Sequence, residues 1–262
     1  MKFSIDNGFL EYEIVGSGLP VLFIHGYPLS RKIWSLQLNA LSNIATTISI
    51  DLRGHGDSYP FDGPYTMDLL ADDCKKLLEY LHFFSPVVVC GLSMGGYVIL
   101  SMYKKYPEYV KGMILTSTRP GPDSPEGKIK RDISISTVHQ HGSRLIAENM
   151  LPNLFSPVTL TENLQLVNQI HTMMVNTSVQ GIIGALQGIR DRPDSVPLLS
   201  KIRCPVLIVH GTEDKIVPMN EAEMMEQQIP NSRLVKIYNT GHLPNLEQPD
   251  IYNQTLRDFL RS

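Results

Sequence analysis

The sequence lacks three features that mark special classes of protein: a block of basic residues, a paired cysteine spacing and a membrane-length apolar run. Its 23 lysines and arginines stand against 26 aspartates and glutamates, a formal net charge of −3. That balance disfavours nucleic acid or an anionic membrane surface as the main partner. A membrane-spanning helix needs about 18 or more consecutive apolar residues, and no run approaches that length. We therefore expect a protein that binds neither nucleic acid nor membrane.

Cysteine usage and the N-terminal residues indicate a compartment. Cys74, Cys90 and Cys204 form no C-x-x-C pair, which is typical of buried thiols in a reducing environment. Asp6 interrupts the N-terminal residues before any apolar stretch of signal-peptide length. We expect a soluble, cytoplasmic protein. A chain of 262 residues can bury roughly three quarters of its unfolded surface, so its core requires neither a metal nor a disulfide.

Short apolar segments alternate with helix-length segments in the first half and the last third of the chain. Most of these apolar segments are continuous rather than alternating, as in strands that are covered on both faces of a parallel sheet. The expected strands are residues 9–15, 21–24, 44–50, 87–90, 113–115, 206–209 and 234–237. The expected helices are about residues 31–41, 67–82, 95–106, 219–228 and 250–260. This order predicts an α/β fold with a mostly parallel central sheet flanked by helices.

Residues 119–197 break this alternation and contain no strand pattern. Apolar residues recur three or four positions apart there, for example at Leu164, Val167 and Ile170, as in amphipathic helices. Ser124 followed by Pro125 has the pattern of a helix N-terminus. We interpret residues 119–197 as a helical cap over a core domain formed by residues 1–118 and 198–262. A small packing subdomain without a catalytic part is the alternative.

A candidate nucleophile lies in the segment Gly-Leu-Ser-Met-Gly-Gly at residues 91–96. The bare G-x-S-x-G pattern is weak, but here it stands between an expected strand and an expected helix. A sharp turn at that point would raise Ser93 above the carboxyl end of the sheet, and Gly91 and Gly95 would avoid collisions with neighbouring backbone. The pattern therefore indicates a nucleophilic serine, with an ordinary glycine-rich turn as the alternative.

A serine hydroxyl needs a base and an orienting acid to act as a nucleophile at neutral pH. Asp214 follows the expected strand 206–209, and His242 follows the expected strand 234–237. Both should lie at the same edge of the sheet as Ser93, in the chain order Ser, Asp, His that is expected for this fold. Glu213 and Asp250 are weaker candidates for the acid.

The segment His-Gly-Tyr-Pro at residues 25–28 also follows a strand. The backbone N–H of Tyr27 is the expected second oxyanion donor, because Gly26 allows a tight turn, and the N–H of Met94 at the helix start is the first. His25 competes as a general base, but a histidine in such a turn more often braces the loop.

These segments together resemble the α/β-hydrolase superfamily over essentially the whole chain. The motifs that carry the resemblance are HGYP at 25–28, DLRGHGDS at 51–58, GLSMGGY at 91–97, GTED at 211–214 and GH at 241–242. Residues 91–97 and 119–124 are most similar to small bacterial carboxylesterases and 3-oxoadipate enol-lactonase-like proteins. The resemblance implies a Ser93–His242–Asp214 triad with oxyanion donors at Tyr27 and Met94. Relatives that act as haloalkane dehalogenases or epoxide hydrolases carry aspartate at the position of Ser93, so those reactions are set aside.

The expected reaction is hydrolysis of a short-chain acyl ester through an acyl-enzyme intermediate. It requires no metal and no organic cofactor, and the remaining histidines form no H-E-x-x-H motif. Residues 119–197 hold seven Lys/Arg and seven Asp/Glu, so no net charge there favours an anionic substrate. That balance favours a carboxylesterase over an enol-lactonase, although one arginine such as Arg119 or Arg190 would suffice to hold a carboxylate.

The residues that line the substrate pocket are weakly indicated by the sequence. We expect Trp34, Met150, Leu154 and Met173 among them, with packing between helices as the alternative for each. The expected partner is a small-molecule ester or lactone, and a homodimer is left open. A slow-turnover ligand receptor of the same fold, a perhydrolase and a C–C bond hydrolase would use the same triad and are left open as well.

Overall fold

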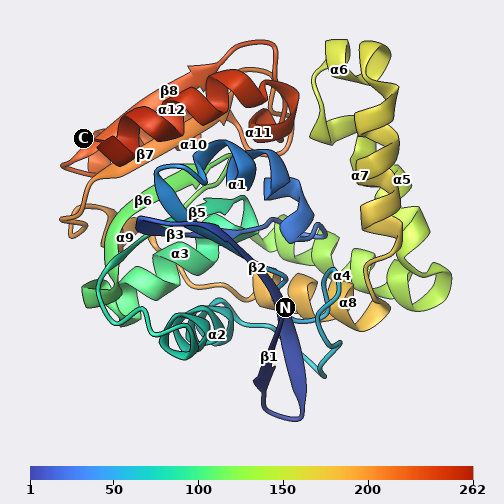
Figure 1. Ribbon diagram of the computed structural model, residues 1–262. Helices are drawn as coiled ribbons and strands as arrows, with labels where there is room; N and C mark the ends of the chain where they lie inside the picture. Colours follow the sequence, from blue (N-terminus) through green and yellow to red (C-terminus); the bar gives the residue numbers. More distant parts are fainter. Residues whose placement is uncertain (262) are drawn as a thin grey trace.

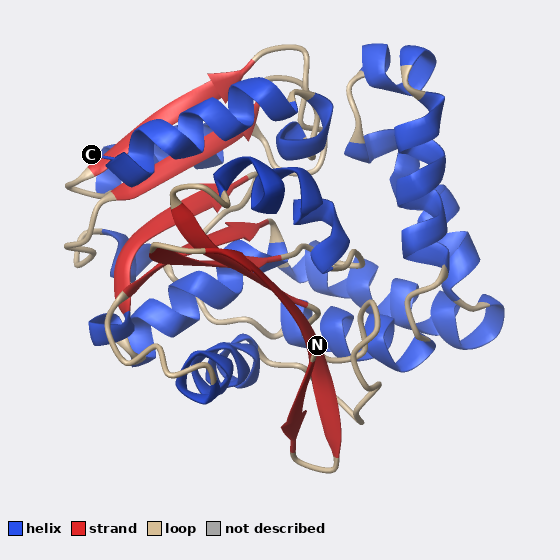
Figure 2. Cartoon of the chain, in the orientation of Figure 1, coloured by secondary structure: helices blue, strands red, loops and turns tan. Residues whose placement is uncertain are grey.

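The computed structural model describes residues 1–261, which form an eight-stranded sheet with helices on both faces (Figures 1 and 2). The strands are β1 (Lys2–Ile5), β2 (Gly8–Gly16), β3 (Leu19–Ile24), β4 (Ala45–Ile50), β5 (Val87–Leu92), β6 (Val110–Thr116), β7 (Val206–Gly211) and β8 (Ser232–Ile237). Their order across the sheet is β1-β2-β4-β3-β5-β6-β7-β8. The β1–β2 and β2–β4 pairs are antiparallel, and the pairs from β4 to β8 are parallel. The predicted α/β fold with a mostly parallel sheet is confirmed.

Alternate residues of the central strands supply the two faces of the sheet, since residues i and i+2 of a strand point the same way. Leu22 and Ile24 of β3 belong to a core cluster that also contains residues of α2, α3 and α10, whereas Val21 and Phe23 belong to a second cluster with residues of α1 and α12. These helices are α1 (Ser35–Leu41), α2 (Met67–Tyr80), α3 (Met94–Lys105), α10 (Met219–Gln228) and α12 (Pro249–Arg261), and short helical segments lie at η1 (Arg31–Trp34), η2 (Pro107–Tyr109) and α11 (Pro244–Glu247).

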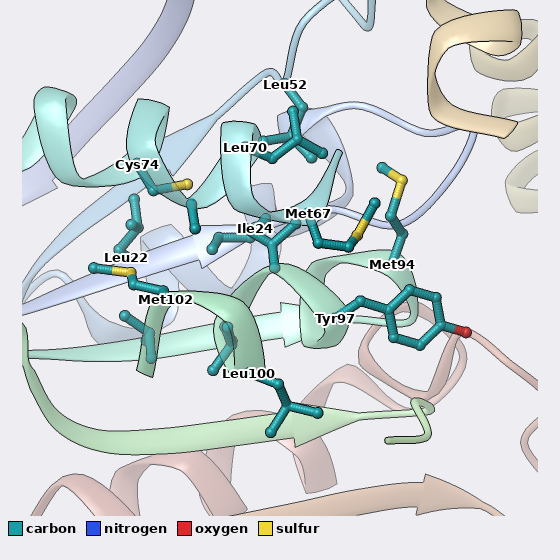
Figure 3. Close-up of a cluster of buried hydrophobic side chains, with 14 of the residues drawn as sticks. Leu22, Ile24, Leu52, Met67, Leu70, Cys74, Met94, Tyr97, Leu100 and Met102 are labelled. Carbon is teal, nitrogen blue, oxygen red and sulfur yellow. The ribbon is translucent and has the colours of Figure 1, made fainter. Parts of the chain in front are cut away.

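The larger of the two core clusters holds the start of α3 in place. Figure 3 shows its side chains from β3, α2 and α3, among them Leu22, Ile24 and Cys74, which are fully buried. Each large aliphatic side chain stabilises the fold by about 1.5–3 kcal/mol when it leaves water. Met94, the first residue of α3, belongs to this cluster and is 1% exposed. The core therefore fixes the helix that follows the expected nucleophile.

Residues 119–197, here called the helical insertion, contain helices and no strand. They are α4 (Pro125–His141), α5 (Ser143–Leu154), α6 (Pro157–Glu162), α7 (Leu164–Val175) and α8 (Val179–Arg190), and α9 (Val196–Leu199) extends past residue 197. The predicted helix start is confirmed, because Ser124 Oγ accepts the N–H of Gly127. Figure 1 shows α5, α6 and α7 standing beside the sheet, with α4 and α8 packed on each other below them.

Two details differ from the sequence-based expectations. Strand β1 was not expected, because four residues that alternate between exposed and buried give little pattern. Cys74 and Cys90 are buried as expected, whereas Cys204 is half-buried. Within residues 1–261, no helix has both the length and the apolar character needed to cross a membrane.

Candidate active site

Ser93 lies at the sharp turn between β5 and α3. Its backbone has φ 53° and ψ −110°, a conformation that is strained for a residue with a side chain. The N–H of Ser93 donates to the carbonyl of Thr116 at 2.9 Å and ties the turn to β6. A Cβ on Gly91 would lie 2.5 Å from the carbonyl carbon of Gly95, so this turn requires glycine there. The surrounding structure therefore holds Ser93 at the carboxyl end of the sheet.

His242 and Asp214 meet at the same edge of the sheet. His242 lies in the loop after β8, Asp214 lies in the loop after β7, and the Nδ1–Oδ2 distance between them is 2.8 Å. An ionised carboxylate only accepts hydrogen bonds, so Nδ1 of His242 carries the proton and Nε2 is left as a proton acceptor. Neither Glu213 nor Asp250 forms a hydrogen bond or ion pair with His242 within residues 1–261.

The loop after β7 keeps Asp214 ionised and oriented. Its Oδ1 accepts the N–H groups of Ile216 at 2.8 Å and Val217 at 3.0 Å, which leaves Oδ2 for His242. Burial raises the pKa of Asp214, but His242 and the backbone donor together lower it by more, so it lies below its ordinary value. His210, which the sequence did not single out, supports this loop through a 2.9 Å contact between Nε2 and the Val217 carbonyl.

Ser93 and His242 line one cavity of about 60 Å³. Its other lining residues are Tyr27, Met94, Tyr97, Arg119, Arg131, Met150, Ile189, Ile216 and Val217. Among the hydrogen bonds of residues 1–261, none joins Ser93 to His242, and such bonds often tighten only when substrate is present. A second cavity of about 320 Å³ shares Tyr27, Arg131, Met150 and Ile216 with the first. The two cavities therefore meet at these shared residues.

Two backbone N–H groups near Ser93 are free to donate. Within residues 1–261, neither the N–H of Tyr27 nor that of Met94 donates to a protein acceptor. A Cβ on Gly26 would lie 3.3 Å from Cβ of Ser93, so the loop after β3 passes close to Ser93. These are the two N–H groups that the sequence indicates as oxyanion donors.

His25 braces the loop that carries Tyr27. It is fully buried, its Nε2 accepts the N–H of Leu52 at 3.0 Å, and its Nδ1–H donates to the Gly26 carbonyl at 2.9 Å. Burial lowers the pKa of His25 to about 4. This is the bracing role expected from its place in the turn, and it leaves His25 unsuited to act as the general base.

Two arginines of the helical insertion also face the Ser93 cavity. Arg119 and Arg131 each donate to the buried carboxylate of Asp123, at 2.8 and 2.9 Å, and Arg192 donates to the same carboxylate at 2.8 Å. The sequence offered Arg119 as a carboxylate ligand but did not single out Arg131 or Asp123. Arg190 lies outside both cavities.

The expectations for the pocket lining need correction, because only Met150 of the four residues lies in either cavity. Trp34 is fully buried in the core, with its ring 5.2 Å from that of Phe23. Leu154 is also fully buried, and its carbonyl accepts the N–H of His242 at 2.8 Å. Met173 lines a separate surface hollow. Apolar character alone does not distinguish a core position from a pocket position in this helical insertion.

The described residues contain no group of three or more His, Cys, Asp or Glu side chains arranged to hold a metal ion. The expectation that the reaction needs no metal or organic cofactor stays a prediction.

Known proteins are similar to this chain over nearly its whole length. Residues 21–255 match the model of the alpha/beta hydrolase family. An AB hydrolase superfamily protein of Bacillus subtilis is 30% identical over 263 residues, which is 97% of this chain and 96% of that protein.

Two solved structures are similar in fold and in sequence. A thermophilic esterase from Thermogutta terrifontis, solved with malate bound, is 39% identical and has a TM-score of 0.95, covering 97% of this chain and 93% of that one. The enol-lactonase from Burkholderia xenovorans is 25% identical and has a TM-score of 0.93, covering 100% of both chains.

Proposed function

The chain belongs to the alpha/beta hydrolase family, and from this premise we propose that it hydrolyses short-chain carboxylic esters with a Ser93–His242–Asp214 triad. The observation that carries the proposal is the 2.8 Å bond between His242 and Asp214, beside a cavity that His242 shares with Ser93. The esterase from Thermogutta terrifontis, similar over 97% of this chain, supports the same class of reaction.

In the proposed mechanism, Ser93 Oγ attacks the ester carbonyl carbon while Nε2 of His242 takes the hydroxyl proton. His242 then gives that proton to the leaving alcohol, and Asp214 stabilises the imidazolium between the two transfers. The N–H groups of Tyr27 and Met94 bind the oxyanion, and loss of one such donor typically lowers turnover by about 10²–10³-fold. Water activated by His242 releases the acid and restores the Ser93 hydroxyl.

The helical insertion serves in this proposal as a cap that limits the substrate. Arg131, Met150 and Ile189 of the insertion line the same cavity as Ser93 and His242. A space of about 60 Å³ next to the nucleophile accommodates a short acyl group, and longer parts of a substrate would enter the adjoining cavity of about 320 Å³. We therefore expect activity to fall as the acyl chain lengthens.

A lactone is the second candidate substrate. A lactone is a cyclic ester, so the same triad opens it by the same steps. The similarity to the enol-lactonase from Burkholderia xenovorans, and the 24% identity to 3-oxoadipate enol-lactonase 2 of Acinetobacter baylyi over 92% of this chain, favour this candidate.

The test is a kinetic panel of p-nitrophenyl acetate, butyrate and octanoate, with γ-butyrolactone and an enol-lactone beside them. We expect Ser93→Ala to lower kcat/KM by at least about 10⁴-fold on every substrate that the wild type cleaves. Ser35→Ala, an exposed serine on α1, is the control and should leave the rates unchanged.

Three results would contradict or redirect the proposal. Equal rates for the wild type and Ser93→Ala would contradict it. A single slow turnover, with a melting temperature that rises on addition of ligand, would favour a receptor. Faster cleavage of the enol-lactone than of every ester would favour the lactonase.

A further inference from the structure

Three arginines near the proposed nucleophile are paired with a single aspartate, so positive charge is in excess there. Arg119, Arg131 and Arg192 share the single carboxylate of Asp123. Burial raises the pKa of Asp123, but Arg131 and Arg192 lower it by more, so this carboxylate is ionised. Glu221 of α10 acts on Arg119 through its charge and forms no hydrogen bond with it. The protein as a whole carries a formal net charge of −3, so this excess is local.

The three guanidinium groups differ in how many of their donors are used. All three nitrogens of Arg192 donate hydrogen bonds, since it also donates to the carbonyls of Gly121 and Ile189, and its guanidinium stacks on the ring of Tyr97. Within residues 1–261, Arg131 forms only the bond from Nε to Asp123, which leaves both of its terminal nitrogens free. Arg119 also has a side-chain hydrogen bond with Tyr97, and its Nε is buried without a protein partner. Unused donors are therefore found on the two arginines that line the cavity.

Tyr27 adds a third unused donor at the same place. Its side chain is only 8% exposed, and its buried hydroxyl has no hydrogen-bond partner within residues 1–261. Burial raises the pKa of Tyr27, so the hydroxyl keeps its proton at neutral pH. Tyr27 and Arg131 line both cavities, so both residues lie where the cavities meet.

We propose that a carboxylate carried by the substrate binds between Tyr27 Oη and the guanidinium groups of Arg131 and Arg119. A carboxylate has two oxygens that only accept hydrogen bonds, so it satisfies a hydroxyl and a guanidinium together. This inference rests on the proposed function and narrows it: the preferred substrates are short esters or lactones with a free carboxylate away from the bond that is cleaved.

The kinetic test compares monomethyl adipate with methyl hexanoate, which have six-carbon acyl chains and differ in the group at the far end. We expect kcat/KM to be about 10–100-fold higher for the half-ester, the range that charge-assisted hydrogen bonds supply. Monomethyl succinate, glutarate and pimelate then locate the chain length that places the carboxylate best. Raising the salt concentration should reduce the preference, since Arg131 is partly exposed.

Two variants test the donors. Arg131→Gln should lower the preference for the half-ester by about 10-fold, and Arg190→Gln, at a partly exposed arginine of the same insertion that lines neither cavity, should leave it unchanged. Tyr27→Phe should lower the preference as well while leaving the melting temperature unchanged or higher, because it removes a buried hydroxyl that has no partner. A hydroxyl with a merely structural role would instead give a lower melting temperature and an unaltered preference.

A binding measurement separates this inference from the proposed function. Calorimetry with Ser93→Ala and adipate needs no catalysis, and it should show binding that Arg131→Gln weakens. Ser93-dependent cleavage with equal rates on half-ester and neutral ester would overturn the carboxylate site and leave the esterase intact. Adipate binding without Ser93-dependent cleavage would overturn the esterase alone. Inorganic phosphate binding as tightly as adipate would reveal a general anion site and overturn the carboxylate assignment.

Discussion

Two halves of the cavity are held in place by different kinds of bond. The sheet half, formed by Ser93, Asp214 and His242, is fixed by hydrogen bonds that involve backbone groups next to the strand ends. The insertion half, which includes Arg119 and Arg131, is fixed by ion pairs between side chains. Bonds to the backbone restrict geometry more closely than bonds between long side chains. The sheet half is therefore the more precisely positioned part of the cavity.

Each half contains a buried acid, and the two acids have different partners. The side chains of Asp214 and Asp123 are both 1% exposed. Asp214 accepts hydrogen bonds from His242 and two backbone N–H groups and has His210 Nε2 3.6 Å from its Oδ2, whereas Asp123 is held by three arginines. The first arrangement orients the imidazole of His242, the proposed general base, and the second concentrates fixed positive charge.

The largest expected difference between the two halves is the loss of kcat in Asp214→Asn, a change in the sheet half. The amide would favour the wrong tautomer of His242, and the equivalent change in a serine protease lowers kcat by about 10⁴-fold. We expect kcat on p-nitrophenyl butyrate to fall by about 10³–10⁴-fold with little change in KM. Glu213→Gln, one residue away, should retain full activity. Unchanged kcat in Asp214→Asn would remove Asp214 from the triad.

Acid should destabilise the sheet half before the insertion half. His25 follows β3 and His55 lies in the loop after β4, and both are fully buried, with ring centres 5.1 Å apart. Burial lowers their pKa values to about 4 and about 3. The unfolded chain binds these two protons below the ordinary value of 6.5 and the folded chain does not. Their contribution to stability is thus complete above pH 6.5 and is lost as the pH falls, by roughly 3 kcal/mol per pH unit at the steepest.

The insertion half should respond to acid in a lower range. The pKa of Asp123 lies below its ordinary 3.8, so its contribution is present above that value and is lost as the pH falls through the lowered pKa. Hydrogen exchange should show protection lost in residues 51–58 at a higher pH than in residues 119–131. The control variant is His139→Gln, which removes a histidine at an exposed position on α4 and should leave both pH ranges unchanged. Simultaneous loss in both segments would show that the halves unfold together.

The sheet half could be predicted from the sequence because each of its features is local. Ser93 is defined by the glycines within two residues of it, and Asp214 and His242 follow apolar runs that read as strands. The parallel order of those strands then brings their ends together, so three separate local patterns converge at one site.

The insertion half could not be predicted because its features depend on contacts between distant helices. Arg131 of α4 and Arg192, which follows the end of α8, reach one carboxylate, and no local pattern indicates that they meet. The balanced charge count of residues 119–197 also does not show where the charged side chains lie. Ion pairs such as Arg190 with Asp132 lie on the surface, whereas the unbalanced arginines face the cavity.

A pair of glycine substitutions compares the packing of the two halves. A Cβ on Gly95 would lie 2.3 Å from the Ile24 carbonyl oxygen, where backbone leaves no room. A Cβ on Gly121, at the start of the helical insertion, would meet nothing within 4 Å. Urea unfolding should show Gly95→Ala destabilised by roughly 3 kcal/mol and Gly121→Ala stabilised by about 0.5 kcal/mol. Similar values for both variants would show that the sheet half is not the more tightly packed.

The smallest effect on stability that still separates the halves is expected from Asp123→Asn. Breaking a fully buried ion pair costs roughly 3–5 kcal/mol. Arg119 and Arg131 keep 27% and 30% of their side-chain surface exposed, so water screens part of the repulsion left among the arginines, and we expect about 2 kcal/mol. Because the triad is bonded to other groups, kcat on a neutral short ester should fall by much less than in Asp214→Asn. Hydrogen exchange should increase in α4 and α8 and stay unchanged in the loop at Asp214. A loss of protection that reached this loop would mean that the ion pairs of the insertion also position the triad, and the division into two halves would fail.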